Sequence, residues 1–167
     1  MQENKKQREN TSSPIHVIGT SAGGLETLPS NLKKLILSSK KIAAPKRLLE
    51  KIPTWWSHVK GEVPHPDFFP TDSPTELITW IKAQSTQIIV ISSGDPLWFG
   101  IGRYLIESFP KSQLIFHPSA TSMQLAFARI GRQWQDASWI SIHGRDPGPL
   151  AKELQKRPRA LAILTDP

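Results

Sequence analysis

Short runs of β-branched and apolar residues recur along the chain and alternate with segments that have the period of a helix. The apolar runs lie at 15–19, 41–44, 88–92, 113–117, 138–142 and 160–164. Helical spacing of apolar positions marks 25–37, 73–84 and 121–130, with one or two helical turns at 45–52. This alternation predicts an α/β fold with a largely parallel sheet and helices on both faces.

The clearest helix start is the segment Ser73-Pro74-Thr75-Glu76. Ser73 can cap the first turn, and Pro74 occupies the first helical position, where its missing N–H costs nothing. Leu77, Ile78 and Ile81 then form one apolar stripe, and we expect the helix to end near Gln84.

The segment 53–74 interrupts this rhythm with five prolines and the pair Trp55-Trp56. Proline removes a backbone donor and restricts the residue before it, so we expect an irregular connection. At the amino end, residues 1–13 are polar and charged and predict a disordered tail. The remaining 14–167 end directly after an apolar strand, which suggests one lobe of a domain that is cut at its carboxyl end.

The composition narrows the class of protein. The 167 residues include no cysteine, so disulfides and thiolate metal sites are excluded, and we expect no metal site. No apolar leader follows the first methionine, and no stretch approaches the ~20 apolar residues that span a bilayer. We therefore expect a cytoplasmic protein without a membrane partner.

The net charge of +7 is concentrated at 31–60, where eight Lys or Arg residues accompany only Glu50. A solvated basic face is the interpretation that we favour. A basic nucleic-acid-binding α/β domain is an alternative, and a small polyanionic ligand would be attracted equally well.

The most informative stretch is IIVISSGDPLWFGIGRYL at 88–105. A strand stops at Ser93-Gly94-Asp95-Pro96, which predicts a tight loop before the start of a helix. Loops at the carboxyl ends of strands are where ligands bind in open α/β sheets. Gly94 lets backbone approach a ligand, while Asp95 can cap the helix or accept hydrogen bonds. An ordinary turn would use the same residues.

The first strand is followed by Gly19-Thr20-Ser21-Ala22-Gly23-Gly24. A glycine-rich loop before a helix can cradle a phosphate or a nucleoside. The loop also matches G-x-S-x-G, so a serine esterase that uses Ser21 is a further alternative, although no clear Asp and His follow in the required order. The dinucleotide fingerprint is not present.

Two long motifs carry a resemblance to the tetrapyrrole (corrin/porphyrin) methylases. SGDPLWFGIG resembles the SGDPxxxGIG loop of that family. HPSATSMQLAFARIGRQWQDASWISIHGR, at 117–145, is similar to a segment of its members that methylate carbon 5 of a corrin precursor. The first-strand loop is similar to the family's GxGPGG, with Ser21 and Ala22 as departures. The resemblance covers about 15–167.

The resemblance implies an S-adenosylmethionine-dependent C-methyltransferase that acts on a precorrin in cobalamin biosynthesis. It also implies a domain of two α/β lobes with the cofactor between them, of which this chain would be the amino-terminal lobe, and a possible homodimer. The implied cofactor-binding residues are Ser93, Gly94, Asp95, Trp98, Thr121 and Ser122.

Substrate-binding residues are expected around the same edge of the sheet. Arg145 follows a flexible glycine and could hold a substrate carboxylate in a bidentate fork. We expect the strand at 138–142 to bring it to the sheet edge that carries Gly94 and Asp95. The implied substrate-binding set is Gly19, Ala22, Gly23, Arg103, His143 and Arg145, and no residue is nominated as catalytic.

Overall fold

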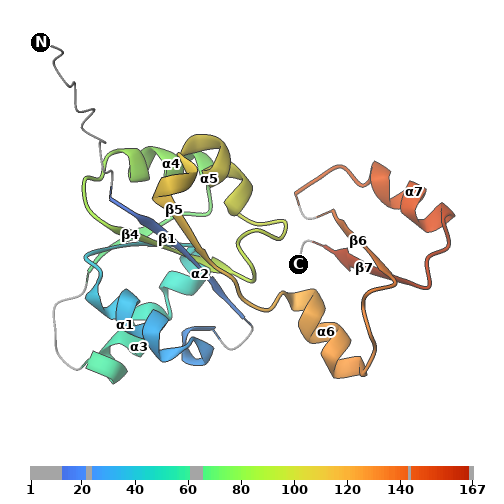
Figure 1. Ribbon diagram of the computed structural model, residues 1–167, viewed down its shortest axis with the longest axis horizontal. Helices are drawn as coiled ribbons and strands as arrows, with labels where there is room; N and C mark the ends of the chain where they lie inside the picture. The colour runs from blue at the N-terminus through green and yellow to red at the C-terminus, as the bar shows by residue number, and fades with distance from the viewer. Residues whose placement is uncertain (1–12, 22–23, 61–65, 143, 166–167) are drawn as a thin grey trace, which may run out of the picture.

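The computed structural model describes residues 13–21, 24–60, 66–142 and 144–165. Its centre is a parallel sheet of five strands in the order β3-β2-β4-β1-β5 (Figure 1). The strands are β1 (Ile15–Thr20), β2 (Lys41–Ala44), β3 (Asp67–Pro70), β4 (Ile88–Ser93) and β5 (Leu114–His117). The predicted tail 1–13 lies almost wholly outside the described residues.

Helices cover both faces of this sheet, which confirms the predicted fold class (Figure 1). On one face, α1 (Ser30–Ser38) and α3 (Ile52–Lys60) enclose a core around Ile42 and Ile89. On the other face, α4 (Pro74–Lys82) and α5 (Gly102–Ser108) enclose a core around Val17 and Val90. Because β4 is buried on both faces, its run Ile88–Ile91 is continuously apolar.

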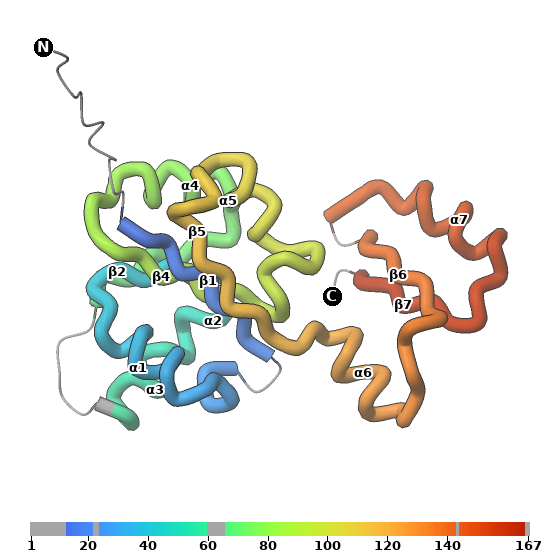
Figure 2. Tube along the Cα trace, viewed as in Figure 1, coloured from blue at the N-terminus to red at the C-terminus, as the bar shows by residue number. Residues whose placement is uncertain are grey.

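A second sheet contains β6 (Ala137–Ser141) and β7 (Ala160–Leu164), which pair in parallel through α7 (Gly148–Gln155). The chain reaches it from β5 through α6 (Ser122–Ile130), as the trace in Figure 2 shows. The expectation that the strand at 138–142 extends the first sheet is therefore wrong. Met123 and Phe127 of α6 pack against Ala137, so these strands have their own core.

The expectation of an irregular connection over 53–74 is also wrong in two places. Helix α3 begins at Ile52 and accommodates Pro53 in its first turn, where the N–H has no helical partner. Ile52 and Trp56 are fully buried and supply the apolar contacts that stabilise the helix. Strand β3 ends at Pro70 and lies at the edge of the sheet, where proline is tolerated.

Two further elements differ from the sequence pattern in their bounds. The helix expected over 25–37 is a 3₁₀ turn (Gly24–Thr27) followed by α1, because Pro29 separates the two. Helix α4 begins as predicted, and the Ser73 side chain accepts a hydrogen bond from the Glu76 N–H.

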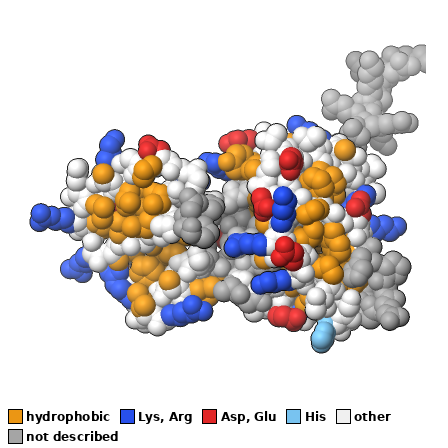
Figure 3. Space-filling model, turned by 180° about the vertical axis from the view of Figure 1, so that it is seen from behind, with side chains coloured by type: hydrophobic (Ala, Val, Ile, Leu, Met, Phe, Trp, Pro, Cys, Tyr) orange, Lys and Arg blue, Asp and Glu red, His pale blue; other side chains and the backbone are white. Residues whose placement is uncertain are grey.

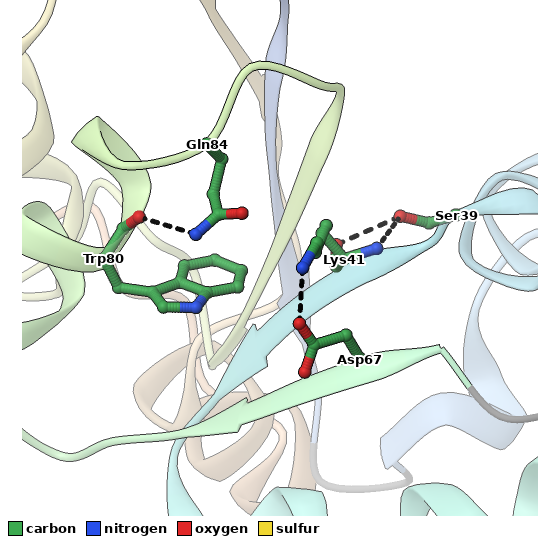
Figure 4. A network of polar contacts seen from close by, with 5 residues as sticks. All are labelled: Ser39, Lys41, Asp67, Trp80 and Gln84. Atoms are coloured by element: carbon green, nitrogen blue, oxygen red, sulfur yellow. Dashed lines mark hydrogen bonds and ion pairs between the residues drawn. The ribbon is translucent and has the colours of Figure 1, made fainter.

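Polar contacts join the edge strand β3 to its neighbour β2 near the amino ends of the two strands (Figure 4). Lys41 and Asp67 face each other across the two strands and form an ion pair at 2.5 Å. Ser39 contacts the backbone of Lys41. Trp80 of α4 stacks on Phe69 of β3 with 4.9 Å between the ring centroids, so this aromatic pair packs the helix against the edge strand.

Two histidines lie side by side on β1 and the edge strand β5. The Nδ1 of His16 lies 3.0 Å from the Nε2 of His117, and their rings stack at 5.3 Å between centroids. Burial lowers the pKa of both imidazoles, and the charge of His117 lowers the pKa of His16 further. The folded chain therefore favours the neutral forms of the pair.

This pair predicts a loss of stability in acid. An unfolded histidine has a pKa of about 6.5, so below that pH the unfolded chain binds more protons than the folded chain does. The free energy of unfolding should fall as the pH drops through this range and level off below the folded pKa values. Urea unfolding at about pH 7.5 and about pH 5.5 should show a smaller drop for His117→Gln than for the wild type.

The exposed His58 provides a matched control. His58→Gln should keep the full drop of the wild type. An equal drop in wild type, His117→Gln and His58→Gln would mean that the pair is not the source of the pH dependence.

Candidate functional site

A cavity of about 840 Å³ opens at the carboxyl ends of the strands. That volume is in the range of small-molecule sites, roughly 300–1,000 Å³. Its wall comes from the ends of β1, β2 and β4, from the segments before α4, α5 and α6, and from the ends of β6 and β7. The cavity therefore lies between the first sheet and the second one, even though the two sheets do not join.

The loop after β4 is fixed to the end of β1 by backbone contacts. The Gly94 N–H donates to the carbonyl of Thr20 at 2.7 Å, and the Thr20 hydroxyl donates to the carbonyl of Ser92 at 2.9 Å. Gly94 has a φ of +69°, and a Cβ at this position would meet nothing within 4 Å. Glycine is needed here for its left-handed backbone, and the space beside it stays open.

Asp95 does not cap a helix, because α5 begins only at Gly102. Its Oδ1 instead accepts a hydrogen bond from the Leu97 N–H at 2.8 Å, which makes an Asx turn. Its other carboxylate oxygen has no hydrogen bond within the described residues. The carboxylate thus shapes the loop with one oxygen and can accept from a ligand with the other.

Gly19 is not part of the cavity wall, contrary to the expectation that it binds substrate. A Cβ at Gly19 would lie 2.5 Å from the carbonyl oxygen of Gly94 and 2.9 Å from the side chains of Pro96 and Ser119. The absence of a side chain therefore allows three loops to close against one another. Gly19 therefore allows the loops of the cavity wall to pack together, although it does not line the cavity itself.

Two neighbouring serines on β4 differ in their surroundings. Ser92 lines the cavity and is 7% exposed, and its Oγ has no hydrogen-bond partner among the described residues. Ser93 is exposed and accepts a hydrogen bond from the Nη2 of Arg47 at 2.9 Å. Ser92 and Arg47 were not predicted from the sequence. Arg47 lies just after the carboxyl end of β2, as Gly94 lies just after that of β4. This position after a strand is the signal that could have identified it.

Aromatic side chains and two guanidinium groups form the wall between the two sheets. Arg145 lies over the ring of Phe99 at 5.1 Å, and Phe99 meets Trp98 edge to face at 4.9 Å. Arg103 lies over the ring of Tyr104 at 4.3 Å. A smaller adjoining cavity of about 350 Å³ is lined by Leu97, Trp98, Phe99, Gly100, Arg103, Trp139 and Arg145. This wall suits a flat, conjugated ligand that carries carboxylates.

Thr121 and Ser122 reach the cavity at the start of α6. The Thr121 hydroxyl accepts from the Gln124 N–H at 3.1 Å, and the Gln124 side chain accepts from the Thr121 N–H at 2.8 Å. This capping box employs Thr121 in the helix itself. Ser122 is exposed beside it.

Three of the expected substrate-binding residues, Ala22, Gly23 and His143, lie outside the described residues. Ser21 lines the cavity, and its Oγ lies 3.0 Å from the Oγ1 of Thr27. Within the described part of the chain, no histidine is hydrogen-bonded to Ser21, so nothing there supports an esterase.

The basic segment 31–60 does not present all of its charges as one surface. Lys41 is paired with Asp67, the Lys33 ammonium donates to the Glu26 carbonyl, and Arg47 lines the cavity. On the face shown in Figure 3, acidic and basic side chains are interspersed on the larger part of the molecule. Nothing here favours a nucleic-acid surface.

A family model described as "Tetrapyrrole (Corrin/Porphyrin) Methylases" matches residues 14–167. The chain belongs to this family. Two solved structures share the fold at 22% identity: a precorrin-6Y methylase from Archaeoglobus fulgidus (TM-score 0.65, 92% of this chain and 73% of that one) and the methyltransferase CobJ (TM-score 0.61, 87% and 62%).

Curated relatives in this family include a precorrin-6Y C(5,15)-methyltransferase [decarboxylating] from Sinorhizobium sp, 28% identical over 152 residues. A cobalt-precorrin-7 C(5)-methyltransferase from Salmonella typhimurium is 34% identical over 91 residues. The alignments cover 91% and 54% of this chain, but only 35% and 44% of those methylases. The chain thus spans less than half of their length.

Two features are absent from the described residues. No group of three or more His, Cys, Asp or Glu residues there could hold a metal ion. No helix among them is long and apolar enough to cross a membrane.

The packing of Gly19 can be tested by Gly19→Ala. The added methyl must displace the backbone of the loop at Gly94, and we expect a loss of about 1–3 kcal/mol in the free energy of unfolding, measured by urea denaturation. Gly148→Ala is the control, because its Cβ would meet only the flexible carboxylate of Asp146. Equal stability of the two variants would contradict the close approach.

Proposed function

We propose that this chain is the part of an S-adenosylmethionine-dependent C-methyltransferase that binds the methyl donor and methylates a precorrin in cobalamin biosynthesis. The observation that carries the proposal is one cavity lined by both long motifs. It joins Gly94 and Asp95 of the first motif to Thr121, Ser122 and Arg145 of the second. The names of the relatives support carbon 5 as the site of methylation.

The residues present fit a nucleoside donor. The unpartnered Ser92 hydroxyl provides a buried polar contact, and the open side of Gly94 lets a ligand approach the backbone. Asp95 adds negative charge beside it. We assign Ser93, Gly94, Asp95, Trp98, Thr121 and Ser122 to the donor, with Thr121 restricted to contacts that its capping box leaves free.

S-adenosylmethionine, when bound, supplies a methyl group on a positively charged sulfur. The Asp95 carboxylate would stabilise that positive charge through space and would accept a hydrogen bond from the donor. Trp98 and Phe99 give the cavity an apolar aromatic wall. The protein thus contributes alignment, a low-polarity surrounding and complementary charge.

On the substrate side, we assign Arg103 and Arg145 to the acetate and propionate groups of the acceptor. Both guanidinium groups lie over aromatic rings, which orients them while leaving N–H donors available. The same contacts hold them beside the cavity that a flat macrocycle would enter.

We further propose a cytoplasmic location, which agrees with a family of biosynthetic methylases. The division into a tail at 1–13 and an amino-terminal lobe at 14–167 stays a prediction, as does a homodimer.

The role of Asp95 can be tested by calorimetric titration of Asp95→Asn. The amide oxygen can still accept from the Leu97 N–H, so the loop is kept while the charge is lost. We expect about tenfold weaker binding of S-adenosylmethionine. Binding of S-adenosylhomocysteine, which has no positive sulfur, should weaken less.

Asp72→Asn is the matched control, because it removes a carboxylate from another part of the same wall. It should leave both affinities within about twofold of the wild type. Failure of the folded wild type to bind either adenosyl compound would contradict the assignment of this cavity to the donor. Equal effects of the two variants would mean that the negative charge of the whole cavity, and not Asp95 in particular, favours the positively charged donor.

A further inference from the structure

Arg47 brings a third guanidinium group to the cavity from the β2 side of the loop after β4. It lies in the single-turn helix α2 (Lys46–Leu49), directly after β2, and Pro45 beside it also lines the cavity. Because β2 and β4 are neighbours in the sheet, their carboxyl ends meet. The side chain crosses this junction, and its Nη2 donates to the Ser93 hydroxyl at 2.9 Å.

Among the described residues, a single hydrogen bond uses the guanidinium group of Arg47. A guanidinium carries several N–H donors in a planar fork, and the contact to Ser93 engages one end of it. The ion pairs found among the described residues join Lys41 to Asp67, Arg132 to Asp136 and Lys156 to Glu153. Within the same residues, none of the cavity's three arginines, Arg47, Arg103 and Arg145, has a carboxylate partner.

The charge on Arg47 does not suit the reacting end of the methyl donor. A positively charged sulfur is repelled by a guanidinium, whereas a carboxylate is bound by it in a bidentate fork. Carboxylates occur on both proposed ligands, on the amino-acid end of the donor and around the rim of the acceptor. The charge of Arg47 therefore suits a ligand carboxylate, and the two sources of that carboxylate need to be separated.

The positions of the three arginines favour the acceptor. Arg103 and Arg145 also line the smaller cavity, next to Phe99 and Trp139, whereas Arg47 lines only the main one. Arg47 follows the end of β2, whereas Arg103 lies on α5 and Arg145 lies in the loop after β6, so the three arginines come from separate elements. A macrocycle with carboxylates around its whole rim can meet such separated cations together, but the single carboxylate of the donor cannot.

We propose that Arg47 binds a carboxylate side chain of the tetrapyrrole acceptor and so helps to select a polycarboxylate substrate. This inference rests on the proposed function, because it takes the acceptor from there. Arg47 is a specificity residue in this proposal, and it takes no part in the transfer of the methyl group. The hydrogen bond to Ser93 positions it beside the donor loop.

The experiment measures binding of uroporphyrin I, a porphyrin whose ring carries acetate and propionate groups, by quenching of tryptophan fluorescence in the full chain. Arg47→Gln should weaken binding about tenfold, and Arg47→Lys should restore part of it, since it keeps the charge without the fork. S-adenosylhomocysteine should bind to Arg47→Gln within about twofold of the wild type.

Lys46→Gln is the matched control, because Lys46 is the exposed neighbour of Arg47, does not line the cavity and carries the same charge. It should leave the affinity for uroporphyrin I unchanged. Equal weakening by Lys46→Gln and Arg47→Gln would overturn the proposal in favour of the general basic field of 31–60. Weaker binding of S-adenosylhomocysteine alone would also overturn it and would assign Arg47 to the donor's carboxylate.

Failure of the proposal is distinguishable from failure of the proposed function. If the wild type binds S-adenosylhomocysteine but not uroporphyrin I, the donor site stands and the inference on Arg47 is wrong. If the wild type binds uroporphyrin I with the expected dependence on Arg47 but binds no adenosyl compound, the assignment of the donor fails and the carboxylate-binding role of Arg47 stands.

Discussion

The close contact between the ends of β1 and β4 is the constraint on which the rest of the site depends. The Gly94 N–H reaches the Thr20 carbonyl, and Gly19 allows the approach because it has no side chain. Parallel pairing of β1 with β4 along their whole length brings these two loops to one level. The carboxyl ends of these strands and the loops after them thereby form a concave wall that includes Asp95.

The glycines of the SGDPLWFGIG loop have separate physical roles. Gly94 is needed for its positive φ, while Gly102 packs directly on the carbonyl oxygen of Pro96, where a Cβ would lie at 2.5 Å. Its own N–H also donates to that carbonyl at 2.8 Å. The later part of the motif thus folds the loop back on itself and delivers Phe99, at a φ of +52°, to the aromatic wall. A motif typical of ligand binding is in large part a packing motif.

Local features of the sequence predicted much of the fold. The apolar runs predicted the described strands except β3, and the cap at Ser73 placed the start of α4, because both depend on neighbouring residues. The helix α3 was missed because Pro53 and Pro64 outweighed the burial of Trp55 and Trp56, which depends on distant partners. The separate pairing of β6 with β7 was missed for the same reason, since an apolar run does not specify which sheet it joins.

For the site, the motifs placed Gly94, Asp95 and Arg145 at the cavity. The strand before Arg145, however, belongs to the second sheet and not, as expected, to the first. The role of Gly19 and the orientation of Arg47 follow from contacts across 75 and 46 positions of the chain respectively, as Gly19 meets Gly94 and Arg47 meets Ser93. Such contacts depend on the order of strands, which the sequence pattern left open.

The strand order has a consequence for the way in which this chain acquires its structure. Strands β1 and β2 are consecutive in the sequence, but β4 lies between them in the sheet. A nascent chain that has not yet reached Ser93 lacks the strand that joins these two, and its apolar strands have no neighbour at the centre. Because distant pairing slows folding, we expect β1 and β2 to join one sheet only after β4 has left the ribosome.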